Sequence, residues 1–167
     1  LSPVIFGGFT LVRSLKPLDI IPLPTLEELY VIITHPLIEL RTKDARLLIN
    51  KNTELEKAIV QWANLGGFVA SLYTKNYELL SKTIEDVIIE PQRIKLIPDY
   101  EEIVDAASIY ALGSGISGAG PSIFSICKGK KNAELVLQRI KKVTDKKSIE
   151  YNLILSKINT DGIKIIN

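Results

Sequence analysis

Gly113–Ser122 reads Gly-Ser-Gly-Ile-Ser-Gly-Ala-Gly-Pro-Ser, and the apolar run Ile-Phe-Ser-Ile-Cys at Ile123–Cys127 follows it directly. Glycine allows positive φ angles and lets other groups approach the backbone closely. A segment this rich in glycine can therefore cradle an anion with its backbone N–H groups. It can equally form a tight turn that packs against a neighbouring loop. The apolar run after it predicts that the turn enters a strand.

The glycine segment does not match the common nucleotide-binding motifs. No lysine follows its last glycine, which excludes a G-x-x-x-x-G-K-[ST] phosphate loop. Gly113, Gly115 and Gly118 reproduce the letters of G-x-G-x-x-G, but that motif opens a helix. Here Gly120-Pro121 and a β-prone run follow instead, so we reject a dinucleotide-binding interpretation.

The composition is that of a globular protein, and it excludes several classes of function. The 167 residues provide for one domain, or for one domain and part of another. A net charge of +2 argues against a dedicated nucleic-acid binder. No apolar stretch reaches the roughly 18 residues that predict a membrane-spanning helix, and no signal peptide is visible. The single cysteine, Cys127, lies in an apolar run, where we expect it to be buried, and a cytoplasmic location follows from these features.

The hydrophobic pattern predicts strands interleaved with helices. The expected strands are Val4–Val12 around Gly7-Gly8, Leu29–Thr34, Ile123–Cys127, Glu150–Lys157 and Ile163–Ile166. The expected helices are Thr42–Ile49 with Thr42 as N-cap, a longer one from about Thr53 to Tyr73, Tyr77–Val87, Tyr100–Tyr110 and Ala133–Val143. Helices that all pack on one face predict an α+β two-layer sandwich with split βαβ, ferredoxin-like topology over residues 29–167. Residues 1–28 look like the end of a different, β-rich unit.

The longest expected helix, after Thr53, carries apolar residues at three- and four-residue spacing. This spacing is typical of an amphipathic helix that faces a core. Trp62 belongs to the stripe, so we expect it to pack inside rather than to bind a ligand. The pair Gly66-Gly67 lowers helix stability, and the close approach of another helix could offset that cost.

Two arginines are candidates for binding an anion. Arg46 follows Thr42 by four residues, so both side chains lie on one side of the first helical turn. Arg93 lies in the irregular segment after Pro91, which is a poor place for a purely solvated charge. Arginine grips a carboxylate or phosphate with two parallel hydrogen bonds. The alternative is that both are surface residues that contact only water.

Four segments, in order, resemble the GHMP small-molecule kinases and, within them, the homoserine kinases. They are Ser2–Val12, the T-K-x-A-R element Thr42–Arg46, the E-P-x-R-x-x-L-I-P element Glu90–Pro98, and the glycine-rich third motif Gly115–Ser122. The resemblance spans nearly the whole chain. It implies that residues 1–28 end an N-terminal GHMP kinase domain and that residues 29–167 form the C-terminal GHMP kinase domain.

The resemblance also implies an activity and a set of site residues. The activity is ATP-dependent, Mg²⁺-assisted phosphorylation of the L-homoserine hydroxyl to O-phospho-L-homoserine, a step in threonine biosynthesis. Thr42, Arg46, Arg93 and Gly118 are implied to bind the substrate, with the arginines near its carboxylate. The third-motif loop, which packs beside the phosphate loop, is implied to use Gly115, Ser117, Gly118, Gly120 and Ser122.

The chain departs from the family in one large respect. The phosphate loop P-x-x-x-G-L-G-S-S-A-A and the H-x-D-N stretch do not occur in this chain, which begins at Leu1 and contains no methionine. We therefore expect the C-terminal half of an enzyme, without catalytic residues or metal ligands of its own. It would be inactive without the N-terminal half, where ATP and Mg²⁺ mainly bind.

Other partners and other functions stay open. The family is often dimeric, so a homodimer is one expected partner, whereas no nucleic acid or membrane is expected. One alternative function is that of another GHMP kinase, of the mevalonate or shikimate type. The other is a non-catalytic amino-acid-binding module with the same fold.

Overall fold

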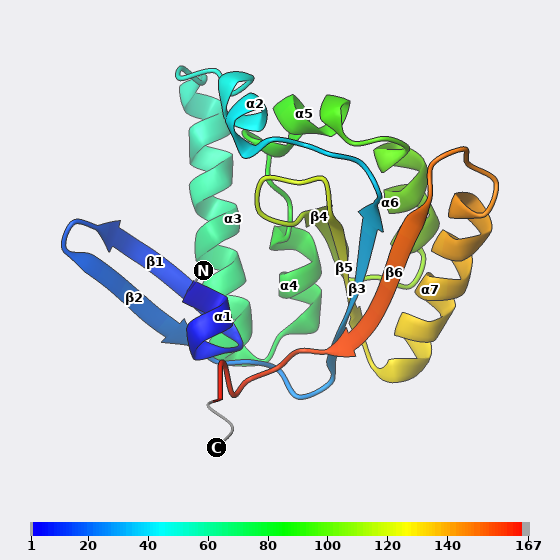
Figure 1. Ribbon diagram of the computed structural model, residues 1–167. Coiled ribbons are helices and arrows are strands. Elements are labelled where there is room, and N and C mark those ends of the chain that lie inside the picture. The colour runs from blue at the N-terminus through cyan, green and yellow to red at the C-terminus, as the bar shows by residue number, and fades with distance from the viewer. Residues whose placement is uncertain (1, 165–167) are drawn as a thin grey trace.

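The computed structural model describes residues 2–164, and its centre is a four-stranded antiparallel sheet (Figure 1). The strands are β3 (Leu29–Pro36), β4 (Gly113–Ile116), β5 (Ile123–Lys128) and β6 (Tyr151–Lys157), in the spatial order β4-β5-β3-β6. The central strand β3 pairs with β5 on one side and with β6 on the other. Ile32 lies opposite both Ser125 and Leu155, and its side chain is fully buried.

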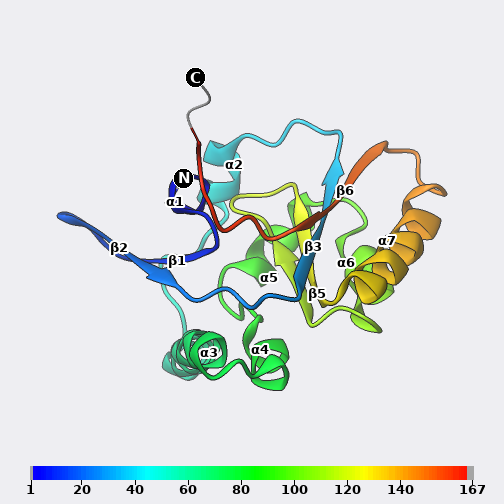
Figure 2. The ribbon, with the colours of Figure 1, turned by 90° about the horizontal axis from the view of Figure 1, so that it is seen from below.

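Two helices cover one face of this sheet. They are α6 (Tyr100–Ser108) and α7 (Lys130–Thr144), and they run beside each other behind β3, β5 and β6 in Figures 1 and 2. The core between the helices and the sheet consists of Ile32, Ile97, Tyr100, Ile103, Ala107, Ile123, Cys127, Ala133, Val136 and Ile140. With this strand order, the chain has the predicted ferredoxin-like topology.

Of the described helical segments between β3 and α6, only the 3₁₀ turn η1 (Ile94–Leu96) packs against that core, through Ile94, contrary to the expectation of one helical face. The other segments are α2 (Thr42–Leu47), α3 (Leu55–Thr74), α4 (Tyr77–Thr83) and α5 (Glu90–Arg93). Side chains alternate along β5, so Ile126 points away from the α6–α7 core. Leu72 of α3 and Leu80 of α4 pack with Ile126 in a second core, so the α3–α4 pair lies on the other side of β5 (Figure 2).

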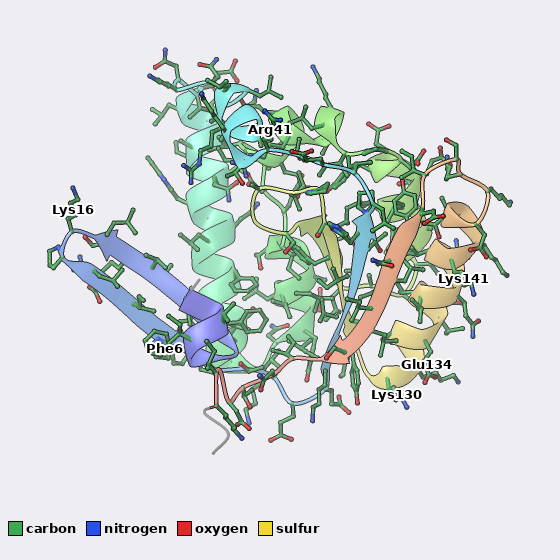
Figure 3. The ribbon with its side chains drawn as sticks, in the orientation of Figure 1. Phe6, Lys16, Arg41, Lys130, Glu134 and Lys141 are labelled. Carbon is green, nitrogen blue, oxygen red and sulfur yellow. The ribbon has the colours of Figure 1, made fainter. Side chains whose placement is uncertain are left out.

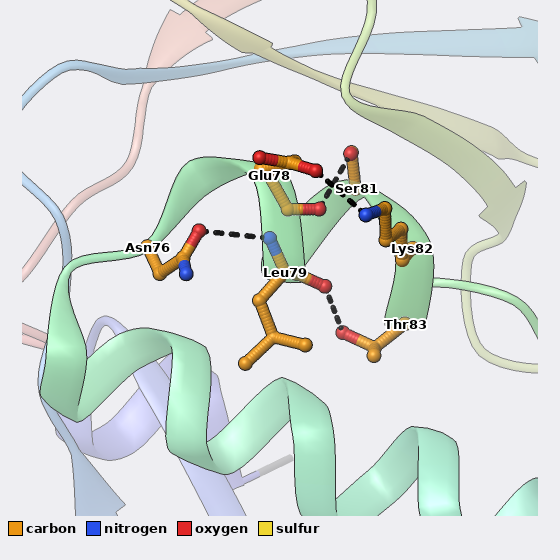
Figure 4. Close-up of polar contacts among 6 residues, drawn as sticks. All are labelled: Asn76, Glu78, Leu79, Ser81, Lys82 and Thr83. Carbon is orange, nitrogen blue, oxygen red and sulfur yellow. Dashed lines mark hydrogen bonds and ion pairs between the residues drawn. The ribbon is translucent and has the colours of Figure 1, made fainter.

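Helix α4 begins at Tyr77, as predicted, but it ends at Thr83, before the predicted Val87. At its start, the Asn76 side chain accepts a hydrogen bond from the Leu79 N–H at 2.9 Å (Figure 4). At its end, Asp86 accepts hydrogen bonds from the backbone N–H groups of Ile88 and Ile89 at 2.9 and 2.8 Å. The aspartate therefore stabilises a turn where the pattern alone predicted another helical turn.

The N-terminal segment differs from its prediction. Residues before Gly7 form helix α1 (Ser2–Phe6), and the strands are β1 (Phe9–Leu15) and β2 (Leu18–Leu23), which make a separate two-stranded sheet. The backbone at Gly7-Gly8 lies in close contact with the C-terminal segment. A Cβ on Gly7 would lie 2.5 Å from the Gly162 nitrogen, and the Gly8 N–H donates to the Asn159 carbonyl at 2.7 Å.

Three further local expectations are wrong or lie partly outside the described residues. Arg41, not Thr42, is the N-cap of α2, and no side chain caps that helix. Ile163 and Lys164 are not in a strand, and the rest of the expected strand Ile163–Ile166 lies outside the described residues. Trp62 is 63% exposed, so its expected place in the core is wrong.

The lysine-rich face of α7 is exposed to solvent. Lys130, Glu134 and Lys141 point away from the sheet in Figure 3, and the Lys130 ammonium lies 3.6 Å from the Glu134 carboxylate. Among the described residues, no helix is long and apolar enough to cross a membrane.

Candidate substrate-binding site

The first four residues of the glycine segment, Gly113–Ile116, form strand β4, which the sequence did not predict. The rest forms the hairpin loop between β4 and β5, and it enters a strand as predicted. Gly118 and Gly120 have φ angles of 65° and 85°, which a side chain would strain. The Ser117 N–H donates to the Ser122 carbonyl at 2.8 Å, and the Gly120 N–H donates to the Ser117 carbonyl at 3.1 Å. Because the loop uses these two N–H groups internally, the structure favours a tight turn over an anion cradle at these positions.

Glu90 fastens the glycine hairpin to α5. Its carboxylate accepts a hydrogen bond from the Ile116 N–H at 2.9 Å and another from the Tyr100 hydroxyl at 2.5 Å. Burial raises the pKa of Glu90, and the two hydrogen bonds partly offset that effect. A Cβ on Gly115 would lie 2.8 Å from a Glu90 carboxylate oxygen, so glycine is needed there for this close contact. Sequence reasoning assigned no role to Glu90.

Arg93 lies one helical turn beyond Glu90 and holds the tip of the glycine loop. Its Nη1 donates to the Gly118 carbonyl at 2.9 Å. The Arg93 Nε is buried and has no hydrogen-bond partner among the described atoms. A small cavity of about 100 Å³ lies between Arg93, the loop at Gly118, and side chains that include Asp86 and Phe124. The fold therefore holds Arg93 in place and leaves its buried Nε donor without an acceptor among the described atoms.

Thr42 and Arg46 lie on the short helix α2, and both are exposed. The α2 and α5 segments and the glycine loop lie in the upper part of the molecule in Figure 1. The Asn50 N–H after α2 donates to the Gln92 side chain at 2.6 Å, which ties the two segments together. The structure thus places Arg46 and Arg93 in the same region, but Arg46 does not line the Arg93 cavity.

Ser122 has an unexpected partner on the neighbouring strand. The His35 Nδ1 lies 2.8 Å from the Ser122 hydroxyl, so the only histidine of the chain supports the base of the glycine loop. Because β3 and β5 are antiparallel, with Thr34 opposite Ile123, the next residues along each strand meet at this point. No sequence pattern linked these two residues, which are 87 positions apart.

The described residues provide neither a metal-binding cluster nor a reactive thiol. Residues 2–164 contain no cluster of three or more histidine, cysteine, aspartate or glutamate residues that could hold a metal ion. Cys127 is buried, as expected, and burial raises the pKa of its thiol to about 12. This thiol is therefore a poor nucleophile.

Comparison with known proteins agrees with the fold. Residues 68–146 match the family described as GHMP kinases C terminal. The homoserine kinase of Chlorobium phaeovibrioides is 38% identical over 168 residues, and that of Chloroherpeton thalassium is 38% identical over 167 residues. Each match covers 99% of this chain and 52% of the relative, so the chain spans about half the length of the curated relatives it matches.

Comparison with solved structures also finds homoserine kinase, again over about half of its length. The crystal structure of homoserine kinase from Cytophaga hutchinsonii superposes with a TM-score of 0.94 at 41% identity, covering 99% of this chain and 53% of that one. A mevalonate kinase from L. major shares the fold at 15% identity, with a TM-score of 0.59 over 82% of this chain and 45% of that one. The ferredoxin-like sheet, its glycine hairpin and these matches show that the chain carries, over residues 68–146, a C-terminal domain of the GHMP kinase family.

Proposed function

We propose that this chain is the C-terminal part of a homoserine kinase. The enzyme would transfer the γ-phosphoryl group of ATP to the side-chain hydroxyl of L-homoserine and release O-phospho-L-homoserine. Relatives named homoserine kinase that align with nearly the whole chain at 38–41% identity support this substrate over mevalonate or shikimate. The reaction belongs to threonine biosynthesis, with the cytoplasm as its compartment.

The single observation that carries the substrate proposal is the state of Arg93. Its Nη1 is bound to the Gly118 carbonyl, while its Nε is buried without an acceptor. A buried charged donor without a partner is costly, and a carboxylate is the acceptor that fits a guanidinium best. The carboxylate of an amino-acid substrate would supply the missing acceptor. Arg46 and Thr42, on the helix tied to α5, would add a second charge and a hydroxyl.

The glycine loop has a supporting part in this proposal. Ser117 and Gly120 use their N–H groups inside the turn, so the loop's contribution is its shape and its rigid placement of Gly118. Gly115 and Ser122 are held from behind by Glu90 and His35. A loop fixed in this way can pack beside a phosphate-binding loop without changing shape.

The N-terminal half of the enzyme would complete the site. We assign residues 1–28 to the end of the N-terminal domain and residues 29–167 to the C-terminal domain, because β1 and β2 form a sheet that does not continue the central one. ATP and Mg²⁺ would be held mainly by the missing half, and the Mg²⁺ would neutralise charge on the transferred phosphoryl group. This chain would contribute the positioning of the hydroxyl for attack. Alone, it would not turn over ATP.

The test uses the full-length protein that contains these residues. Arg93→Lys keeps the charge but loses the planar donor pair, so we expect the KM for L-homoserine to rise at least tenfold while the KM for ATP stays within twofold. Arg13→Lys, on the exposed β1, is the matched control and should change neither value. An unchanged KM for homoserine in the Arg93→Lys variant would remove Arg93 from the substrate site.

Two simpler measurements separate the alternatives. A thermal-shift screen with homoserine, mevalonate and shikimate identifies the substrate class, and stabilisation by mevalonate or shikimate alone would overturn the homoserine assignment. ADP release with homoserine then separates a kinase from a non-catalytic binding module. The same assay on the 167-residue chain alone should give no turnover.

A further inference from the structure

Helix α5 holds the glycine hairpin at two points. Glu90 and Arg93 are three residues apart on this single turn, so their side chains are neighbours on its surface. The Glu90 carboxylate accepts a hydrogen bond from the Ile116 N–H at 2.9 Å, where β4 ends. The Arg93 Nη1 donates to the Gly118 carbonyl at 2.9 Å, at the tip of the loop. Together the two contacts fix the position of Arg93 relative to Gly118.

Glu90 is itself attached to the core of the domain. Its second carboxylate oxygen accepts a hydrogen bond from the Tyr100 hydroxyl at 2.5 Å. Tyr100 is buried and belongs to the core between the sheet and the helices α6 and α7. Because both carboxylate oxygens are bonded, the side chain cannot rotate without losing a partly buried hydrogen bond. Glu90 thus connects both the hairpin and α5 to the buried core.

The loop needs such a support because its own backbone is permissive. Residues 113–120 contain four glycines, and glycine loses more conformational freedom on folding than any other residue. A Cβ on Gly118 would meet nothing within 4 Å, so no described atom packs against that side of the tip. The N–H groups of Ser117 and Gly120 bond inside the loop, which shapes the turn but does not attach it to α5. Glu90 and Arg93 provide that attachment.

We propose that Glu90 is a positioning residue for the substrate that accepts the phosphoryl group: it sets the places of the Arg93 guanidinium and of the Gly118 loop. This proposal rests on the proposed function, in which Arg93 receives the substrate carboxylate. Both Glu90 oxygens already accept hydrogen bonds from the protein, so its carboxylate acts on the substrate through Arg93 and the loop. The paired hydrogen bonds between a guanidinium and a carboxylate require a fixed orientation. A displacement of about 1 Å at such a site can cost a factor of about 10² in rate.

The first experiment compares variants of the full-length protein that contains these residues. Glu90→Ala removes both hydrogen bonds, so we expect the KM for L-homoserine to rise at least about tenfold while the KM for ATP stays within about twofold. Glu90→Gln can keep both contacts, because its amide oxygen accepts from the Ile116 N–H and its amide nitrogen donates to the Tyr100 oxygen. This variant should therefore have a KM for homoserine within about twofold of wild type.

Ile140→Ala is the control for a loss of stability alone. Ile140 lies on α7, is fully buried in the same core as Tyr100, and leaves a cavity when it is truncated. We expect this variant to have a lower melting temperature but a KM for homoserine within about twofold of wild type. An equal rise of this KM in Ile140→Ala and Glu90→Ala would overturn the proposal, as would a Glu90→Gln variant that behaves like Glu90→Ala.

A double substitution tests whether Glu90 acts through Arg93. Residues that act as one unit have non-additive effects, whereas the effects of independent residues on KM multiply. We expect Glu90→Ala combined with Arg93→Lys to raise the KM for homoserine by no more than about twice the larger single effect. A KM near the product of the two single effects would show that Glu90 acts independently of Arg93, and the proposal would fail.

Hydrogen exchange tests the positioning without reference to the substrate. The N–H groups of Ser117 and Gly120 bond to carbonyls of the loop itself and not to Glu90, so their exchange reports on the loop as a whole. In Glu90→Ala both should exchange at least about tenfold faster than in wild type, whereas Glu90→Gln and Ile140→Ala should leave them unchanged. Unchanged exchange in Glu90→Ala would overturn the proposal whatever the substrate is.

The same set of assays distinguishes failure of this proposal from failure of the proposed function. A wild type that phosphorylates mevalonate or shikimate instead of homoserine would refute the proposed function only, and the KM comparisons then use that acceptor. A wild type that phosphorylates none of the three would overturn both.

Discussion

The Glu90 carboxylate is the polar contact on which the candidate site depends most, and Glu90→Ala is the sharpest test of it. The substitution leaves the Ile116 N–H and the Tyr100 hydroxyl without their acceptor. Tyr100 is 8% exposed, so water does not readily replace the carboxylate there. An unsatisfied buried polar group costs about 1–3 kcal/mol. Relief of the desolvation of the charge offsets part of this, and we expect a net loss of about 2–4 kcal/mol in the free energy of unfolding.

Glu90→Gln separates the hydrogen bonds from the charge. The amide oxygen can accept from the Ile116 N–H, and the amide nitrogen can donate to the Tyr100 oxygen, so both contacts survive. We expect the free energy of unfolding to stay within about 1 kcal/mol of wild type. Gln keeps the size of the Glu90 side chain and both contacts, whereas Ala removes both contacts, which makes Gln the matched control for Ala.

The pH dependence gives a second readout with a definite sign. Because burial raises the pKa of Glu90 in the folded state, folding favours its protonated form. Its contribution to stability is complete below the unfolded value of 4.5 and is lost as pH rises through the raised pKa. Urea titrations between pH 4 and 7 should show this loss in the wild type and a flatter profile in Glu90→Gln. An Ala variant as stable as wild type, or a Gln variant with the wild-type pH profile, would refute the reasoning.

Three further outcomes are expected. Gly115→Ala places a Cβ 2.8 Å from a Glu90 oxygen, and urea unfolding should show a loss of about 1–3 kcal/mol. In Gly66→Ala the added Cβ meets no neighbour within 4 Å, so the substitution should raise the free energy of unfolding by up to about 1 kcal/mol. The Tyr151 hydroxyl is the main cause that lowers the pKa of Asp99, and the resulting stability is present above pH 3.8 and is lost as pH falls through the lowered pKa. Tyr151→Phe should therefore shrink the difference between melting temperatures at pH 7 and pH 2, and an unchanged difference would contradict this assignment.

The central sheet could be predicted because its strands are marked locally. Leu29–Thr34 and Ile123–Cys127 are continuous apolar runs, and both form inner strands that are packed on two faces. The N-terminal helix could not be predicted in the same way. Val4, Ile5 and Phe6 favour a strand by type, but the Gly8 N–H and the Ile5 carbonyl contact the C-terminal segment at Asn159 and Ile163. These tertiary contacts override the local preference.

Within the candidate site, a residue could be predicted only where its own type and its local sequence indicated a function. Arg93 could be singled out because a proline-kinked segment rarely holds a purely solvated arginine, and the structure fixes its side chain on Gly118. Glu90 and His35 gave no such signal. Their partners are 10 and 26 positions away for Glu90, and 87 away for His35, and nothing in the spacing of those residues links them.

Helix α3 shows that hydrophobic periodicity identifies an apolar face of a helix but not whether that face is buried. The apolar stripe is real, but only part of it is buried: Leu72 packs in the second core, whereas Trp62 is exposed. Gln61 and Asn64 lie beside the stripe and hold the segment after α4 with their side-chain amides. Periodicity therefore identifies an apolar face without identifying how much of it the chain itself covers.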